Sequence, residues 1–310
     1  MRRLLRSLGL LIGLLGVVFV ATELARNWQD VREAATGADP ALLIAALVVG
    51  SAGPLAIGLG WRRCLSLLGA RCSVRDTLHW YYVGQLGKYV PGGIWTVVGR
   101  GEMARRAGVP GGIGYSSTIL SLAVTYLAAV LTMALALAAG AAGNDAVAWQ
   151  PVLLLLPLGV LALHPRVVRS LLRVGRRVLR RDLQIPVPRW RDSIGLLVLL
   201  VPAWLAIAAA TWLVAAALDP ATPEVRNLIF ATTLAWIAGF LVVPSPGGIG
   251  VREAVFVAAA TSLASVGIAA AVAVAARVIF VLVDLLGAAV SSALTRCRTS
   301  ARPSGKDPTI

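Results

Sequence analysis

The chain has 310 residues, of which 58% are hydrophobic and only 14% are charged. An average soluble domain carries about 25% charged residues, so this composition excludes a soluble globular protein and indicates an integral membrane protein. The formal net charge of +15 is concentrated in short loops and in the tail, which is typical of cytoplasmic loops and argues against a nucleic-acid partner. The three cysteines and two histidines lack the spacing of metal ligands, so neither a metal site nor a cofactor is expected.

Six apolar stretches approach or exceed the length needed to cross a bilayer core of about 30 Å. In chain order they cover residues 8–25, 41–60, 115–140, 147–164, 194–218 and 265–294. The first could be mistaken for a secretory signal peptide, but cleavage after Ala21 would place Phe19 where a small residue is needed, so we expect a retained span. Basic loops on one side and acidic loops on the other predict that both termini are cytoplasmic.

Two further stretches, residues 76–107 and 225–264, are interrupted near their middle. Proline ends a helix and glycine allows the chain to reverse, so we predict that each stretch forms two half-helices joined by a re-entrant turn at membrane depth. The alternative for the second stretch is that residues 225–243 span the bilayer fully. The predicted turn residues are Pro91, Gly92 and Gly93 in the first stretch, and Pro246, Gly247, Gly248 and Gly250 in the second.

The order of these elements repeats. A span, a broken hairpin and a span make up residues 41–140 and again residues 194–294, and the loop charges place the two hairpins on opposite sides of the membrane. Paired interrupted segments in two inverted halves indicate a transporter with a site near the bilayer midplane. We therefore predict an all-α polytopic membrane protein with about six full spans and two re-entrant hairpins. Residues 1–295 form one domain, and residues 296–310 form a basic cytoplasmic tail.

Charged residues occur within or beside these apolar segments. A charge at the centre of a membrane helix costs about 2.5–3.5 kcal/mol on an insertion scale, so we expect such residues to face the interior and one another. Arg277 and Asp284 are seven residues apart, about 10.5 Å along a helix, and Asp284 is expected to pair with Lys88 or Arg100 instead. The seven residues are Lys88, Arg100, Glu102, Arg252, Glu253, Arg277 and Asp284.

The cations among them predict an anionic ligand. The second half-helix of each hairpin is expected to begin near Trp95 or Val251, and a helix N-terminus favours phosphate or carboxylate. Arg100 and Arg252 follow within the next turns, and a guanidinium can bind phosphate through two parallel hydrogen bonds. We expect the lipid headgroup to be bound by Lys88, Arg100, Arg252 and Arg277, with Glu102, Glu253 and Asp284 as charge partners.

No catalytic motif is visible, neither a nucleophile elbow nor a glycine-rich phosphate loop. Glu102 and Glu253 could form the carboxylate pair of glycosyl chemistry, but each lies beside or close to an arginine, which explains them as charge balance. We therefore expect no catalytic residues and no enzyme activity. The alternatives are a membrane-embedded glycosyl- or aminoacyl-lipid transferase and a scaffold subunit of a lipid-modifying enzyme.

Three segments resemble the two signatures and the final helix of the flippase-like family, the lysylphosphatidylglycerol synthase transmembrane region found in the multiple peptide resistance factor. They are "GQLGKYVPGGIWTVVGRGEMARRAGV", "PSPGGIGVREAVF" and "ARVIFVLVDLLGA". The resemblance implies a bacterial-type inner-membrane protein that moves a modified phospholipid or polyprenyl phosphate between leaflets. Its partners would be membrane lipids and a separate lipid-modifying enzyme, since the soluble aminoacyltransferase domain of full-length resistance factors is expected to be absent here.

Overall fold

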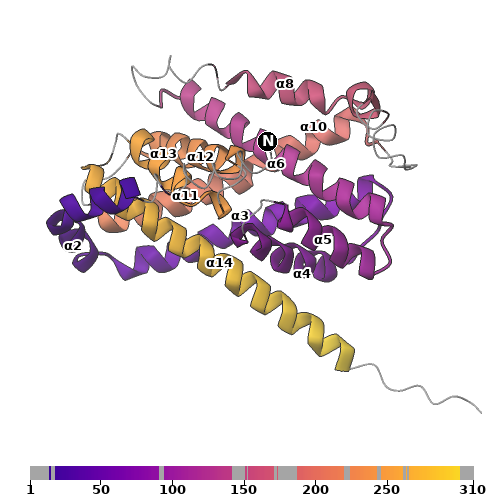
Figure 1. Cartoon of the computed structure of the whole chain (residues 1–310), viewed down its shortest axis with the longest axis horizontal. Helices are drawn as coiled ribbons and strands as arrows, with labels where there is room; N and C mark the ends of the chain where they lie inside the picture. The colour runs from indigo at the N-terminus through magenta and orange to yellow at the C-terminus, as the bar shows by residue number, and fades with distance from the viewer. Residues whose placement is uncertain are drawn as a thin grey trace, which may run out of the picture.

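The regular structure of this protein is helical. The computed structural model describes Leu14, residues 18–90, 94–141, Pro151, residues 153–170, Arg173, residues 187–219, 224–242, 246–260, Leu263 and residues 265–300. Every regular element in these ranges is a helix, which confirms the all-α prediction. Figure 1 shows the helices packed in one bundle, with the C-terminal end of α14 projecting beyond the rest.

Four helical stretches are long and apolar enough to cross a membrane. They are α3 (Pro40–Leu67), α6 (Gly111–Ala138), α10 (Trp190–Leu199) continued by α11 (Val201–Leu218), and α14 (Val266–Ser300). The 28 residues of α3 give a length of about 42 Å, which exceeds the hydrocarbon core of about 30 Å. These helices confirm four of the six predicted spans. The other two predicted spans, at residues 8–25 and 147–164, are described only in part. Residues 18–25 of the first are helical, and α8 (Leu155–Ala162) belongs to the second, but neither stretch is described over its whole length.

Helices α3 and α11 pack closely and run antiparallel. Gly60 of α3 faces Leu200 at the start of α11, and the backbone N–H of Asp39, which caps α3, donates to the carbonyl of Ala217 near the end of α11 at 3.4 Å. Between them, a Cβ added at Gly53 would lie 2.6 Å from Cγ1 of Ile207. Small residues allow such close approach between membrane helices, where dispersion contacts hold the helices together.

We expect Gly53→Val to destabilise the bundle by about 1–3 kcal/mol, because the added side chain must enter occupied space. A Cβ at this position would also lie 3.0 Å from the carbonyl oxygen of Ala203, which is backbone and cannot rotate away. Unfolding in detergent measures the effect. Gly195→Val is the matched control, since a Cβ at that helical glycine meets nothing within 4 Å. Equal loss in both variants would contradict close packing at Gly53.

The two interrupted stretches form helical hairpins. In the first, α4 (Val74–Gln85) and the 3-10 turn η1 (Leu86–Tyr89) precede α5 (Trp95–Arg106), which packs back along α4. In the second, α12 (Val225–Leu241) and the 3-10 turn η3 (Pro246–Gly248) precede α13 (Val251–Ala259), which packs back along α12. The 17 residues of α12 reach about 26 Å, less than the bilayer core. The hairpin prediction is therefore favoured over a full span at residues 225–243.

The hairpins enter the bundle from opposite ends. The first follows the C-terminal end of α3 and the second follows the C-terminal end of α11, and these two helices are antiparallel. In Figure 1, α4 and α5 accordingly lie toward the right of the bundle and α12 and α13 toward the left. The tips meet in the middle: a Cβ added at Gly247 of η3 would lie 3.5 Å from the carbonyl oxygen of Lys88 in η1. This is the inverted arrangement predicted for the two halves.

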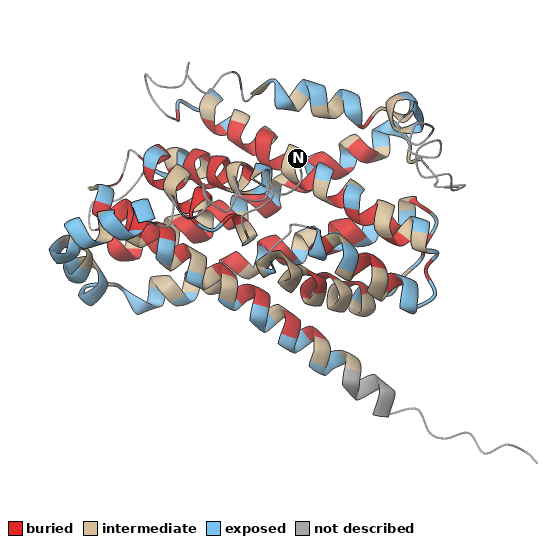
Figure 2. Ribbon diagram, viewed as in Figure 1, coloured by how far each residue is buried: buried red, intermediate tan, exposed pale blue. Residues whose placement is uncertain are grey.

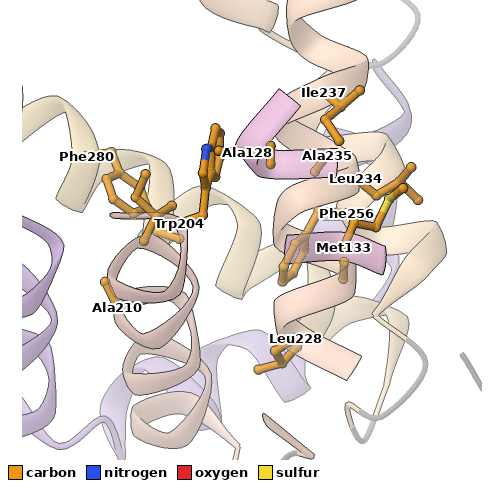
Figure 3. Close-up of a cluster of buried hydrophobic side chains, with 14 of the residues drawn as sticks. Ala128, Met133, Trp204, Ala210, Leu228, Leu234, Ala235, Ile237, Phe256 and Phe280 are labelled. Atoms are coloured by element: carbon orange, nitrogen blue, oxygen red, sulfur yellow. The ribbon is translucent and has the colours of Figure 1, made fainter. Parts of the chain in front are cut away.

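The interior is built from small and aromatic side chains. Figure 2 shows buried residues gathered where helices face one another, with exposed residues on the outer surfaces. Many exposed positions of the long helices are nevertheless apolar, such as Ile44, Ile119 and Val278, as a lipid-facing surface requires. Inside, Trp204 of α11 is 1% exposed and donates its indole N–H to the carbonyl of Thr125 at 2.7 Å. Figure 3 shows Trp204 close to Phe280, with Ala128 of α6 packed near α12.

Candidate functional site

The tip of the first hairpin is tied to α14 by a buried carboxylate. The ammonium of Lys88 lies 2.5 Å from Oδ2 of Asp284, and the hydroxyl of Tyr89 donates to the same oxygen at 2.7 Å. The side chain of Asp284 is 3% exposed and that of Lys88 is 21% exposed. Asp284 thus pairs with Lys88, one of the two partners expected for it, because α4, which leads into η1, packs against α14.

The tip of the second hairpin is tied to α14 in a similar way. Glu253 at the start of α13 forms an ion pair with Arg277, whose guanidinium also donates to the carbonyl of Gly247 at 3.2 Å. The other carboxylate oxygen of Glu253 accepts from the backbone N–H of Gly250 at 2.7 Å, which caps α13. Gly247, Gly248 and Gly250 all have positive φ, a conformation that glycine adopts without steric cost and that lets the chain reverse here.

Arg100 on α5 is almost completely buried and has no carboxylate partner among the described residues. Its side chain is 1% exposed, its guanidinium lies 4.1 Å from the centre of the Tyr81 ring, and Nη2 donates to Oε1 of Gln85. Nε and Nη1 have no hydrogen-bond acceptor there. A buried cation with free donors is costly unless an anion or water binds it.

Arg252 on α13 is the corresponding cation of the second hairpin. It is partly buried, and its guanidinium lies 3.4 Å from the centre of the Trp236 ring and 5.6 Å from that of Phe280. Within the described ranges no carboxylate lies within 4 Å of it, because its neighbour Glu253 is directed to Arg277. The aromatic face stabilises the charge but leaves it unbalanced.

Two adjoining cavities lie where the hairpins meet. The hairpin cavity, of about 130 Å³, is lined by Arg252 together with residues of both turns and of α6. The inner cavity, of about 40 Å³, is lined by Arg100 and Asp284. The residues common to both linings are Gln85, Lys88, Leu122, Tyr126 and Trp236. A larger hollow of about 490 Å³ lies beside the loops at residues 70–73 and 107–110, away from these charges.

The predicted half-helices begin where they were expected. Helix α5 starts at Trp95 and α13 at Val251. Arg100 and Arg252 follow these starts by five residues and by one residue. The predicted turn residues Pro91, Gly92 and Gly93 lie outside the described residues, whereas Pro246, Gly247 and Gly248 form η3.

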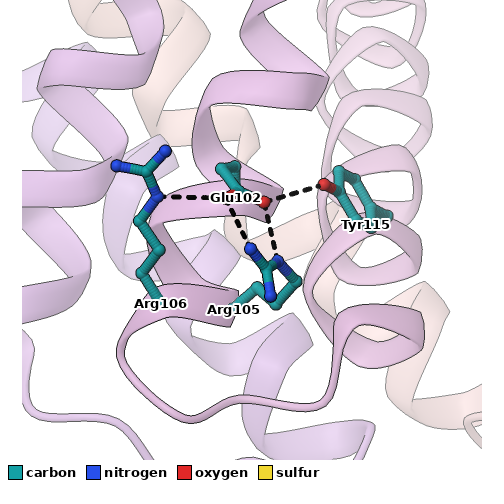
Figure 4. Close-up of polar contacts among 4 residues, drawn as sticks. All are labelled: Glu102, Arg105, Arg106 and Tyr115. Atoms are coloured by element: carbon teal, nitrogen blue, oxygen red, sulfur yellow. Dashed lines mark hydrogen bonds and ion pairs between the residues drawn. The ribbon is translucent and has the colours of Figure 1, made fainter.

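Glu102 corrects the prediction that all seven charges face the interior. Its carboxylate accepts hydrogen bonds from Arg105 at 2.7 and 2.8 Å and from Arg106 at 3.0 Å, and the Tyr115 hydroxyl donates to it at 3.3 Å (Figure 4). These hydrogen bonds lower the pKa of Glu102 to about 2. The side chain is 28% exposed, because it lies at the far end of α5 from the tip. Glu102 therefore balances the basic end of the hairpin and not the site.

Several residues of this site were missed from the sequence. Tyr89 and Gln85 supply a donor and an acceptor, and Trp236 and Tyr126 form aromatic walls. Gln85 is polar within a membrane segment, which is a usable signal. Trp236 and Tyr126 carry no such signal, because aromatic residues are ordinary in membrane helices and only the fold brings these two beside the arginines.

The comparison with known families agrees with this architecture. A family model described as the lysylphosphatidylglycerol synthase TM region matches residues 6–291. This range includes both hairpins and α14 as far as residue 291, and therefore every charged residue of the site. No curated protein matches the chain significantly.

Proposed function

Because this chain belongs to the lysylphosphatidylglycerol synthase TM region family, we propose that it is a membrane carrier that moves an anionic lipid between leaflets. The observation that carries the proposal is the position of Arg100 and Arg252. Each lines one of two adjoining cavities between the hairpin tips, and neither has a carboxylate partner in the described part of the chain. A lipid phosphate would supply the missing negative charge through charge-assisted hydrogen bonds.

The arrangement of the hairpins supports a route across the membrane. Each hairpin enters from its own end and their tips meet near the middle, so movement of one against the other would open the site to one leaflet at a time. The headgroup would lie between the guanidinium groups and the rings of Trp236 and Tyr126, while its hydrocarbon chains stay in the bilayer. The ion pairs with α14 would hold the tips during this movement.

The same proposal includes the setting of the protein. Membership of the family supports a bacterial-type inner membrane, and the basic loops favour both termini in the cytoplasm. Membrane lipids are the direct partners, and a separate enzyme that modifies the lipid is the indirect one. We assign no catalytic residue to this chain.

Lipid movement in reconstituted vesicles tests the proposal. Purified protein is placed in phosphatidylcholine vesicles with acyl-labelled phosphatidylglycerol or phosphatidic acid, and the label that becomes accessible from outside is followed with time. We expect the double variant Arg100→Ala, Arg252→Ala to lower the initial rate about 100-fold, because two charge-assisted interactions of about 1.5 kcal/mol each are removed.

Arg226→Ala is the control for the loss of an arginine. This residue is half exposed and pairs with Glu224, far from either cavity, so the rate should equal that of the wild type. Equal rates in the wild type and the double variant would contradict the proposal. A new lipid product found by mass spectrometry in these vesicles would instead favour a transferase.

A further inference from the structure

The sign of the charge at the site indicates that the ligand is an anion. The number of unbalanced positive charges further indicates how many negative charges that ligand carries. The tips of both hairpins, α5, α13 and the middle of α14 contribute four cations and two carboxylates. Two of the cations are neutralised by ion pairs, Lys88 by Asp284 and Arg277 by Glu253. The other two, Arg100 and Arg252, have aromatic rings and an amide as neighbours in the described structure.

No ionisable residue from the neighbouring gaps can change this count. Residues 91–93 are Pro-Gly-Gly and residues 243–245 are Val-Pro-Ser. Glu102, the remaining acidic residue of the first hairpin's second half, is committed to Arg105 and Arg106. The site therefore carries an excess of two positive charges within the described residues, one from each hairpin.

The two excess charges belong to one binding region. Arg100 lines the inner cavity and Arg252 lines the hairpin cavity, and the two cavities share Lys88, Tyr126 and Trp236 in their linings. Lys88 is held on Asp284 between them and adds a further donor toward both cavities. Charges in a region of low dielectric interact strongly, so a ligand that leaves one guanidinium unbalanced binds less well than one that neutralises both.

We propose that the lipid headgroup bound here carries two negative charges, as a phosphate monoester or a diphosphate does. The proposal rests on the proposed carrier function and specifies its substrate class. A phosphate diester such as phosphatidylglycerol supplies one negative charge and leaves one guanidinium unbalanced. A lysyl ester of phosphatidylglycerol carries a net positive charge, and its ammonium groups are repelled by the site. The lipid after which the family is named is thus a poor ligand for this chain.

The experiment compares headgroups on identical labelled acyl chains in phosphatidylcholine vesicles. The lipids are phosphatidic acid, phosphatidylglycerol and lysyl-phosphatidylglycerol, and a labelled polyprenyl phosphate is measured in parallel. At pH 8 we expect phosphatidic acid or the polyprenyl phosphate to move at least about tenfold faster than phosphatidylglycerol, with the lysyl lipid slowest. If either phosphate monoester moves with this preference, the proposal of a headgroup with two negative charges is supported. The faster of the two lipids then shows whether the substrate is a phospholipid or a polyprenyl phosphate.

Two further arms test the charge count itself. A phosphate monoester loses its second charge near pH 6, so the preference for phosphatidic acid should fall as the pH is lowered from 8 to 5, whereas the single charge of phosphatidylglycerol does not change. Arg252→Gln removes one positive charge and should bring the two rates within about threefold of each other, while Arg252→Lys keeps the charge and should keep the preference. A purely structural role for Arg252 would not move this ratio.

The outcomes separate this inference from the carrier function. If phosphatidylglycerol or its lysyl ester moves as fast as phosphatidic acid, and does so in a way that depends on Arg100 and Arg252, the charge inference is overturned and the carrier function stands. If none of the lipids moves in an arginine-dependent way, the carrier function itself fails.

Discussion

Replacing Asp284 by Asn is expected to lower the free energy of unfolding in detergent by about 3–5 kcal/mol, since breaking a buried ion pair leaves an uncompensated charge. One carboxylate oxygen of Asp284 receives both the Lys88 ammonium and the Tyr89 hydroxyl. The substitution therefore leaves Lys88 uncompensated at the tip of the first hairpin. Because η1 is held to α14 mainly through this oxygen, the first hairpin should also open more readily to proteolysis.

A double-mutant cycle distinguishes the ion pair from simple packing. Lys88→Met alone leaves Asp284 unpaired and should also be strongly destabilising. The combination Lys88→Met, Asp284→Leu should recover most of the loss, because buried ion pairs can often be replaced by apolar residues of similar size at little cost. Glu224→Gln is the surface control, where an exposed pair with Arg226 contributes about 0–1 kcal/mol. Additive losses in the cycle would contradict the pairing.

Glu253→Ala is expected to have the second largest effect, again about 3–5 kcal/mol. The carboxylate of Glu253 neutralises Arg277 and accepts from the backbone N–H of Gly250. Its loss leaves Arg277 with the carbonyl of Gly247, and it removes the cap of α13. Thermal unfolding of the purified protein and the accessibility of a cysteine placed at the exposed Ile249 both report the result.

Glu253→Gln separates the two contributions. Glutamine keeps an acceptor for the Gly250 N–H and loses only the charge. The loss of unfolding free energy should therefore be about half of that caused by Glu253→Ala. Glu224→Ala is the matched control, because Glu224 is 53% exposed in its side chain and makes a surface pair. If Glu253→Gln is as damaging as Glu253→Ala, the cap contributes nothing.

The local architecture could be predicted from the sequence because its causes are local. The length of an apolar stretch decides whether a helix can cross the bilayer, and this identified the spans that became α3, α6, α10–α11 and α14. Proline and glycine end helices through their own covalent geometry, which is why α5 and α13 begin at Trp95 and Val251 as expected. Even the correction at Glu102 had a local signal, since Arg105 and Arg106 follow it at the helical spacings of three and four residues.

The partners within the site depend on the tertiary structure, because they come from elements far apart in the chain. The sequence by itself determined an all-helical membrane protein with two inverted hairpins and a set of cations beside their turns. It left Asp284 free to pair with either Lys88 or Arg100. The packing of α4 on α14 brings Lys88 to Asp284, and Arg100 is therefore left without a carboxylate partner among the described residues. Ion pairing depends on separation in space and not on distance along the chain. Only the folded bundle therefore shows which charges are left for a ligand.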